Sequence, residues 1–397
     1  MIPPWRSDGR WAATALVLLF GLGFALGARR HGMNAALEAV GVAPMSAHFT
    51  DLYTTPAARF EFQRGGNPYV SNPMDPWGRP LNFPRIWLVL MRYPWSAVPA
   101  IGLGLGAAWL IAAFGSLGRI SPATGLIAGA ALCSPPALLA LERANSDLLI
   151  FILLALSLAC LRRERPVGGW LILLVAALLK LYPLAGFAAF LTRGRRRGTG
   201  WIIAAALVLA VWCLVQLPDL RAIWHNTPYG GPAVSYGAGV LLSAADMLHY
   251  DGTGAWGNFV RFAPAAQALA ALAGAALACL GARRPAAAVP AAAAFLAGAA
   301  IYGGTYLIGS NFVYREIFLI FCLPWLGGGA GGRAGRAAIV CLLLSLWINP
   351  MWGATACLTF LRLGANAGLF LLLAWLGGRA AANAGKKSRS NPTGVPV

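Results

Sequence analysis

Charge is scarce in this sequence, and acidic residues are its scarcest part. Only 11% of the 397 residues are charged, with 12 acidic residues against 31 basic ones. Soluble domains average about 25% charged residues, so this composition excludes an ordinary soluble globular protein. The hydrophobic share of 59% is gathered into many runs that approach or exceed about 17 residues, the length that crosses a bilayer.

Metal-binding and disulfide patterns are missing as well. The four histidines and seven cysteines form no CxxC, HExxH or paired-histidine spacing, so no protein-built metal site is visible. Every cysteine lies in or at the end of an apolar run, where it serves as a small core residue. We therefore expect no disulfide framework and no metal centre, and we expect no cofactor.

Internal repeats and nucleotide-binding glycine loops are also absent. A two-halved transporter would show weak internal symmetry, and none is visible. The glycine-rich runs at 21–27 and 327–332 do not open a helix in a strand–helix–strand unit, so neither is a phosphate-binding loop.

Long apolar runs are what the sequence has in abundance. They predict an all-α polytopic membrane protein with about 10 transmembrane helices, an embedded helical hairpin and a large first outer loop. The candidate spans are residues 11–28, 96–114, 121–136, 147–161, 201–217, 258–280, 285–304, 314–327, 337–349 and 355–377.

The interval 168–192 differs from these spans. It is apolar throughout, but it is interrupted at Lys180-Leu-Tyr-Pro183, and arginine clusters flank it on both sides. If the interval crossed the bilayer once, one cluster would lie outside. Because proline breaks a helix, we predict a hairpin of two short helices that enters and leaves the membrane from the cytoplasm.

The net charge of +19 has two interpretations. It suggests nucleic acid, but basic loops that face the cytoplasm also orient membrane proteins. With the N-terminus inside, only Asp8 and Glu164 among the acidic residues fall on the inner side. We therefore expect no nucleic-acid partner, and we expect the outer face, with its loops 29–95 and 218–257, to carry the function.

The domain organisation follows from the same pattern. Residues 1–380 are predicted to form a single integral-membrane domain, because apolar spans recur throughout them. Residues 381–397 are short, basic and rich in Ser, Asn and Pro. This composition predicts a disordered cytoplasmic tail.

Three polar clusters stand out on the predicted outer face. They begin at Asp51, at ERANSD (142–147) and at NFVYRE (311–316), and Lys180 at the hairpin tip is a fourth polar position. Arginine binds phosphate bidentately, and a carboxylate accepts a proton from an attacking hydroxyl. Carboxylates beside arginines at a membrane surface therefore suit transfer of a group from a lipid-linked phosphate to a hydroxyl.

The order of these motifs resembles the GT-C class of polytopic glycosyltransferases, and within it family 87, which includes polyprenyl-phosphate-mannose-dependent mannosyltransferases. The resemblance covers most of residues 40–330. One segment departs from it: LNFPRIW (81–87) stands where the family would have a Tyr-Pro-Pro-like segment, which is compatible with another donor or acceptor. The motifs that carry the resemblance are Asp51, Gly66-Asn-Pro-Tyr69, Asn145-Ser-Asp147, Lys180-Leu-Tyr-Pro183 and Asn311 to Tyr314 before Leu323-Pro324.

The resemblance implies an integral-membrane hexosyltransferase. It would move a mannose-like hexose or related sugar from a polyprenyl-phosphate donor to a glycolipid, a glycan or another hydroxyl acceptor. It would be a multi-pass protein of the cell membrane (a bacterial inner membrane or a plasma membrane) that contacts membrane lipid and serves the cell envelope from the extracytoplasmic face. Asp51 would be the catalytic base. The candidate substrate contacts are Arg59, Asn67, Tyr69, Arg79, Arg85, Arg143, Asn145, Asp147, Lys180, Tyr314 and Arg315.

Other interpretations of the same residues stay open. A transporter or lipid flippase of envelope biogenesis would also carry charged outer loops, and so would a structural component of an envelope assembly system. Asp147 is equally well placed to cap the next helix. Lys180 needs either a bound lipid phosphate or an internal carboxylate or carbonyl partner, because a charge deep in the bilayer costs about 2.5–3.5 kcal/mol on insertion scales.

Overall fold

A computed structural model describes residues 8–228, 230–240, 255–286, 291–348 and 356–384. The described chain is almost entirely helical, and this confirms the predicted all-α class. The first half comprises α1 (Arg10–His31), α2 (Met33–Ala39), α3 (Thr50–Gln63), α4 (Ile86–Leu90), the 3-10 helix η1 (Trp95–Ala97), α5 (Val98–Leu117), α6 (Pro122–Leu132), α7 (Pro135–Arg143), α8 (Ser146–Arg162), α9 (Pro166–Leu179) and the 3-10 helix η2 (Tyr182–Arg193). The second half comprises α10 (Arg195–Val215), α11 (Leu217–Asn226), β1 (Ser235–Tyr236), α13 (Ala255–Ala282), α14 (Ala292–Leu307), β2 (Asn311–Phe312), the 3-10 helix η4 (Val313–Cys322), α15 (Leu323–Gly327), α16 (Gly332–Trp347) and α17 (Ala356–Ala384).

The helices able to cross a membrane are fewer than the predicted spans. Within the described residues, five helices are long and apolar enough, or six if the bent pair α6–α7 forms one span, so a count of about 10 is not confirmed. The difference arises because several apolar runs fold as shorter helices. The 16 residues of α14, in the predicted span 285–304, rise about 24 Å at 1.5 Å per residue, against a hydrocarbon core of about 30 Å.

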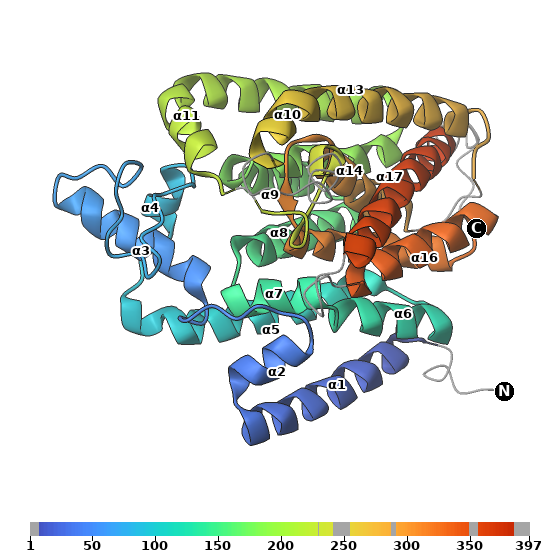
Figure 1. Cartoon of the computed structure of the whole chain (residues 1–397). Helices are drawn as coiled ribbons and strands as arrows, with labels where there is room; N and C mark the ends of the chain where they lie inside the picture. The colour runs from blue at the N-terminus through green and yellow to red at the C-terminus, as the bar shows by residue number, and fades with distance from the viewer. Residues whose placement is uncertain (1–7, 229, 241–254, 287–290, 349–355, 385–397) are drawn as a thin grey trace.

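The long helices form the outside of the bundle, and their apolar side chains point outward. Leu18 of α1, Ile111 of α5 and Leu214 of α10 are 67%, 75% and 72% exposed. Exposed apolar surface of this extent marks contact with lipid or a partner. Figure 1 shows α1 along one edge of the bundle and α10 with α13 along the opposite edge.

The centre of the bundle is built from shorter elements. Phe151 of α8 stacks on Phe321 of η4 with ring centroids 4.3 Å apart. A Cβ at Gly298 of α14 would lie 2.8 Å from the carbonyl oxygen of Phe318, so glycine allows α14 to approach the η4 backbone closely. The core therefore fixes η4, which carries part of the third polar cluster.

The predicted hairpin region contains two helices separated by a break. The first, α9, ends at Leu179, Lys180 is extended with φ −145° and ψ 136°, and η2 begins at Tyr182. At the far end of η2, Arg193 donates to the Glu164 carboxylate and to the Leu161 carbonyl. The end of η2 therefore returns to the turn between α8 and α9.

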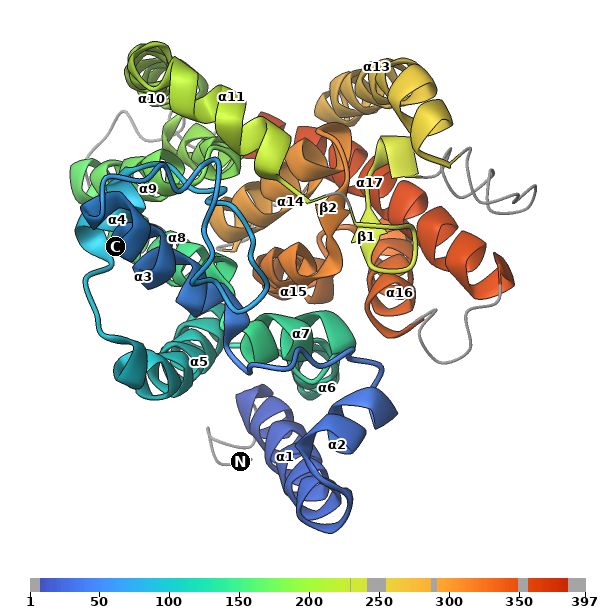
Figure 2. The same ribbon diagram turned by 60° about the vertical axis from the view of Figure 1, so that its left-hand side comes forward.

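The first polar region, residues 46–85, folds beside the bundle rather than as an open loop. Figure 1 shows α3 and α4 at one side of the bundle, and Figure 2 shows α11 running beside the segment that follows α3. The Asn226 side chain at the end of α11 donates to the carbonyls of Tyr69 and Leu81, at 2.8 and 3.0 Å. Arg85 and Asp219 form an ion pair at 2.7 Å. These contacts fasten residues 69–85 to the bundle.

The second predicted outer loop, 218–257, is joined to the segment just before η4 by a short two-stranded sheet. Strand β1 pairs antiparallel with β2, with Ser235 opposite Phe312 and Tyr236 opposite Asn311.

Residues 241–254 of the predicted loop 218–257 lie outside the described residues, as do residues 385–397 of the predicted tail. Residues 381–384 continue α17, where Ala381 and Ala382 favour helix.

Candidate active site

Asp51 lies in the first turn of α3, where the helix dipole favours a carboxylate. The turn that places it is tight: Phe49 has φ 61°, and its N–H donates to the Glu142 carbonyl of α7 at 2.8 Å. A Cβ at Gly102 of α5 would lie 2.6 Å from the Phe49 ring. Glycine at this position therefore leaves room for the turn that starts α3.

The Asp51 carboxylate receives one donor on each oxygen. Arg79 Nη1 lies 2.7 Å from Oδ1, and Asn145 Nδ2 lies 2.5 Å from Oδ2. The Asp51 side chain is 12% exposed. Because an ionised carboxylate has about four acceptor positions, these two contacts leave acceptor capacity at a partly open site.

Arg79 is held by a network that the first polar region supplies itself. Its Nε lies 3.0 Å from Asp75 Oδ1, and its Nη2 lies 2.8 Å from the Thr54 hydroxyl and 2.9 Å from the Thr50 carbonyl. Burial alone would raise the pKa of Asp75, but the hydrogen bond and charge of Arg79 outweigh it and hold that pKa below its ordinary value. Asp75 therefore neutralises much of the charge that Arg79 presents to Asp51.

Asn145 caps α8. Its Oδ1 accepts from the Asp147 N–H at 2.9 Å, so Asn145 occupies the cap, and Asp147, the cap that the sequence suggested, lies in the first turn. Ala144 before it is left-handed with φ 43°. The sequence ERANSD thus turns sharply into a helix whose first polar side chains face the bundle interior.

Asp147 is fully buried and receives three donors. Lys180 Nζ and the Tyr182 hydroxyl bind Oδ1, the latter at 2.8 Å, and Arg315 Nε lies 3.2 Å from Oδ2. The Arg315 guanidinium also lies over the Tyr182 ring, 5.0 Å from its centroid. Lys180, at the break after α9, and Arg315, near the start of η4, therefore bind the same carboxylate. Asp147 is thus the internal partner of the Lys180 charge.

The ion pairs form a nearly neutral cluster. Three carboxylates, Asp51, Asp75 and Asp147, face three cations, Arg79, Lys180 and Arg315. Buried charges persist only when they are paired and hydrogen-bonded, so each member stabilises the others. Asn145 lies between the two groups of charges, since its Nδ2 donates to Asp51 and its Oδ1 accepts from the Asp147 N–H. This connects the partly open carboxylate with the buried one.

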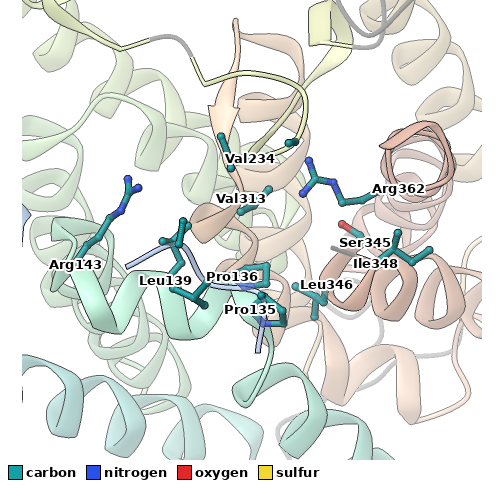
Figure 3. A pocket seen from close by; sticks show the side chains of 14 residues that line it. Pro135, Pro136, Leu139, Arg143, Val234, Val313, Ser345, Leu346, Ile348 and Arg362 are labelled. Atoms are coloured by element: carbon teal, nitrogen blue, oxygen red, sulfur yellow. The ribbon is translucent and has the colours of Figure 1, made fainter. Parts of the chain in front are cut away.

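Arg143 forms no ion pair with any of the described residues. Its Nε is buried with no hydrogen-bond partner, and its guanidinium lies 5.6 Å from the centroid of the Phe312 ring. It lines a cavity of about 40 Å³ that also contacts Val313 and Arg362. Figure 3 shows Arg143 and Arg362 on opposite sides of this cavity with apolar side chains between them.

Tyr314 lies beside this arrangement. Its ring stacks on Phe312 with centroids 5.4 Å apart, and the residue is 7% exposed. The neighbouring Arg315 binds Asp147 and the Asn311 side chain. The cluster NFVYRE therefore contributes Asn311, Tyr314 and Arg315 to one region around Asp147 and Asp51.

Four of the sequence candidates make their contacts elsewhere. Arg59 lies eight residues beyond Asp51 on α3, about 12 Å along the helix axis. Asn67 Oδ1 accepts from the Tyr69 N–H at 3.0 Å and shapes the turn, while the Tyr69 hydroxyl donates to the Phe83 carbonyl at 3.0 Å. Arg85 pairs with Asp219. Asn67, Tyr69 and Arg85 therefore shape the first polar region rather than contact Asp51.

Four residues of the site were not among the sequence candidates: Thr54, Asp75, Tyr182 and Asn311. Each lies within four residues of a named candidate, and Tyr182 and Asn311 also lie in quoted motifs. Thr54 follows Asp51 by three residues, the spacing of one helical face. Asp75 precedes Arg79 by four residues and pairs with it. Tyr182 follows Lys180 by two residues, and Asn311 precedes Arg315 by four. This closeness in sequence was the available signal.

Comparison with known proteins gives one match. The model of glycosyltransferase family 87 matches residues 83–308, which is more than half of the chain. The matched segment contains Arg143, Asn145, Asp147 and Lys180, and it begins after Asp51. A search of curated proteins and a search of solved structures found no match.

Proposed function

Since this chain belongs to glycosyltransferase family 87, we propose that it moves a sugar from a polyprenyl-phosphate donor to a hydroxyl acceptor at the outer face of a cell membrane. A mannose-like hexose is the proposed sugar, and a glycolipid or glycan of the cell envelope is the proposed acceptor. Family membership favours this enzyme over a transporter or flippase. The long apolar helices agree with a donor that is itself embedded in the bilayer.

The proposal rests mainly on the exposure and the hydrogen bonds of the Asp51 carboxylate. Its carboxylate is partly open, is fixed by one guanidinium and one amide, and retains acceptor capacity. In the proposed step Asp51 takes the proton of the acceptor hydroxyl as the acceptor oxygen bonds to the anomeric carbon. The bond from that carbon to the phosphate oxygen breaks, and the lipid phosphate leaves with the electron pair. General-base assistance of this kind contributes about 10²–10⁴-fold.

The leaving phosphate needs a cation that is not already neutralised. Lys180 and Arg315 share Asp147, and Arg79 shares Asp75 and Asp51. Arg143 has an unpartnered Nε and borders a cavity with apolar walls. It is therefore the proposed donor-phosphate contact, because an arginine fork matches phosphate geometry.

The purified protein is expected to transfer sugar from synthetic polyprenyl-phosphate sugars, and Arg143→Gln should raise the donor KM by about 10- to 100-fold. A hydrogen bond to a charged group contributes about 1.5–3 kcal/mol, and each 1.4 kcal/mol is a factor of ten. The measurement is initial transfer rate against donor concentration in lipid nanodiscs. Arg64→Gln, at an exposed arginine after α3, is the matched control. An unchanged KM in Arg143→Gln would move the phosphate to another cation, with Lys180 next.

The proposed orientation places the chain termini and both arginine clusters in the cytoplasm. The contact of Arg193 with Glu164 supports a common side for the clusters at 162–165 and 193–197. In a cysteine-free background, a cysteine at position 64 should react with an impermeant maleimide on intact cells. One at position 195 should react only after lysis. Labelling of position 195 on intact cells would overturn the hairpin and the orientation after it.

A further inference from the structure

Asn145 connects the two carboxylates of the site, and both ends of its amide are in use. Its Oδ1 accepts from the Asp147 N–H at 2.9 Å, and its Nδ2 donates to Asp51 Oδ2 at 2.5 Å. A backbone N–H can only donate, so the amide oxygen must face it. The NH₂ group therefore faces Asp51, and the direction of the amide is set by its surroundings.

The backbone around Asn145 leaves its side chain little freedom. Asn145 is 3% exposed, its own N–H donates to the Ala140 carbonyl at 2.9 Å, and its carbonyl accepts from the Leu148 N–H at 2.9 Å. Ala144 fixes the preceding turn with φ 43°. The donor aimed at Asp51 is consequently held by the start of α8, an element independent of the segment that carries Asp51.

The two donors on Asp51 differ in charge and in attachment. Arg79 belongs to the same polar region as Asp51, and its charge is shared with Asp75. Asn145 is neutral and belongs to the helical core. A neutral donor fixes one oxygen of a carboxylate without adding the full charge of a second cation. The carboxylate is thus held in place by two donors, of which only one is a cation.

We propose that Asn145 is a positioning residue that holds Asp51 in one orientation, with its remaining acceptor positions turned to the acceptor hydroxyl. This inference rests on the proposed role of Asp51 as the base. It also gives a reason for asparagine at this cap. Asp, Ser and Thr cap helices about as well, but aspartate has no donor for Asp51, and the shorter hydroxyl of serine does not reach as far.

Asn145→Asp separates positioning from capping. It keeps a good cap, but it replaces the donor by a second carboxylate next to Asp51, and two carboxylates at this distance share a proton. We expect kcat at pH 7 to fall at least tenfold, and the acid limb of the kcat/KM profile to move upward by about one pH unit or more. Donor KM and melting temperature should stay near their original values.

Asn145→Ser is the second variant, because it caps without reaching Asp51. It should lower kcat while leaving the pH profile in place. Ser146→Ala, at the next residue, removes a hydroxyl with no partner among the described residues and should behave as the unmodified protein. Rates are normalised to folded protein measured by size-exclusion chromatography.

The outcomes are decisive in both directions. Reduced kcat with a shifted acid limb in Asn145→Asp supports the inference, and so does reduced kcat with an unshifted limb in Asn145→Ser. Wild-type kcat and pH profile in Asn145→Asp overturn it, because capping would then be the whole role. Asp51→Asn is measured alongside: if that variant remains active, the proposed function fails, whereas an inactive Asp51→Asn with a wild-type Asn145→Asp sinks the positioning role alone.

Discussion

Asp51→Asn is expected to lower sugar transfer by about 100-fold or more, the lower range of general-base catalysis. Asparagine keeps the size of the side chain, and its amide oxygen can still accept from Arg79 or Asn145, but it cannot take the acceptor proton. The loss should therefore appear in kcat, with the donor KM changed by less than about threefold, the scatter expected of such effects. The measurement is single-turnover and steady-state transfer by purified protein in lipid.

The control for this experiment lies on the same helix. Glu61→Gln removes a carboxylate from α3 ten residues after Asp51, near the helix end, and should transfer sugar at the normal rate. Melting temperatures of both variants should match that of the unmodified protein within a few degrees. Transfer by Asp51→Asn at the normal rate would mean that Asp51 is not the base.

Asp147→Asn is expected to cause the largest loss of stability. It leaves Lys180 and Arg315 without the buried carboxylate that both contact. Breaking a buried ion pair by removing one partner costs about 3–5 kcal/mol, a large part of the 5–15 kcal/mol typical of a folded protein. We expect little monodisperse protein after extraction, and a melting temperature well below normal for what remains.

Lys180→Met is the matched control for Asp147→Asn. Methionine removes one of the two cations, fills a similar volume, and leaves Asp147 paired with Arg315 at 3.2 Å and bonded to Tyr182 at 2.8 Å. It should therefore destabilise much less than Asp147→Asn. Equal melting temperatures for the two variants, or a normal one for Asp147→Asn, would show that the carboxylate does not hold the site together.

The sequence predicted which residues form the site better than it predicted which of them contact one another. Asp51, Asn145, Asp147, Lys180 and Arg315 were candidates, and the structure brings them together across as many as 168 residues of chain. The physical reason is that polar groups at membrane depth must face the bundle interior. Which cation meets which carboxylate depends on packing between distant helices, and no local pattern encodes it.

Local structure in the first polar region was harder to predict. The stretch that begins at Asp51 contains a proline, Pro56, and strong turn residues after it, so it was interpreted as a loop, yet it forms the helix α3. Pro56 lies inside α3 and cannot donate to the Leu52 carbonyl one turn earlier, but that carbonyl accepts from the Tyr93 hydroxyl at 2.7 Å. The substrate-contact roles assigned to Tyr69 and Arg85 came from the family resemblance, whereas their partners, Phe83 and Asp219, are set by how the region packs.

The sharing of Asp147 by two cations also bears on how the chain enters the membrane. Asp147 and Lys180 are 33 residues apart, so they leave the ribosome close together and can cross the insertion machinery as a compensated pair. Arg315 is synthesised on the order of ten seconds later, at about 5–20 residues per second. Arg315 can therefore join Asp147 only after three quarters of the chain have been synthesised. The polar centre of the enzyme is thus completed late in synthesis.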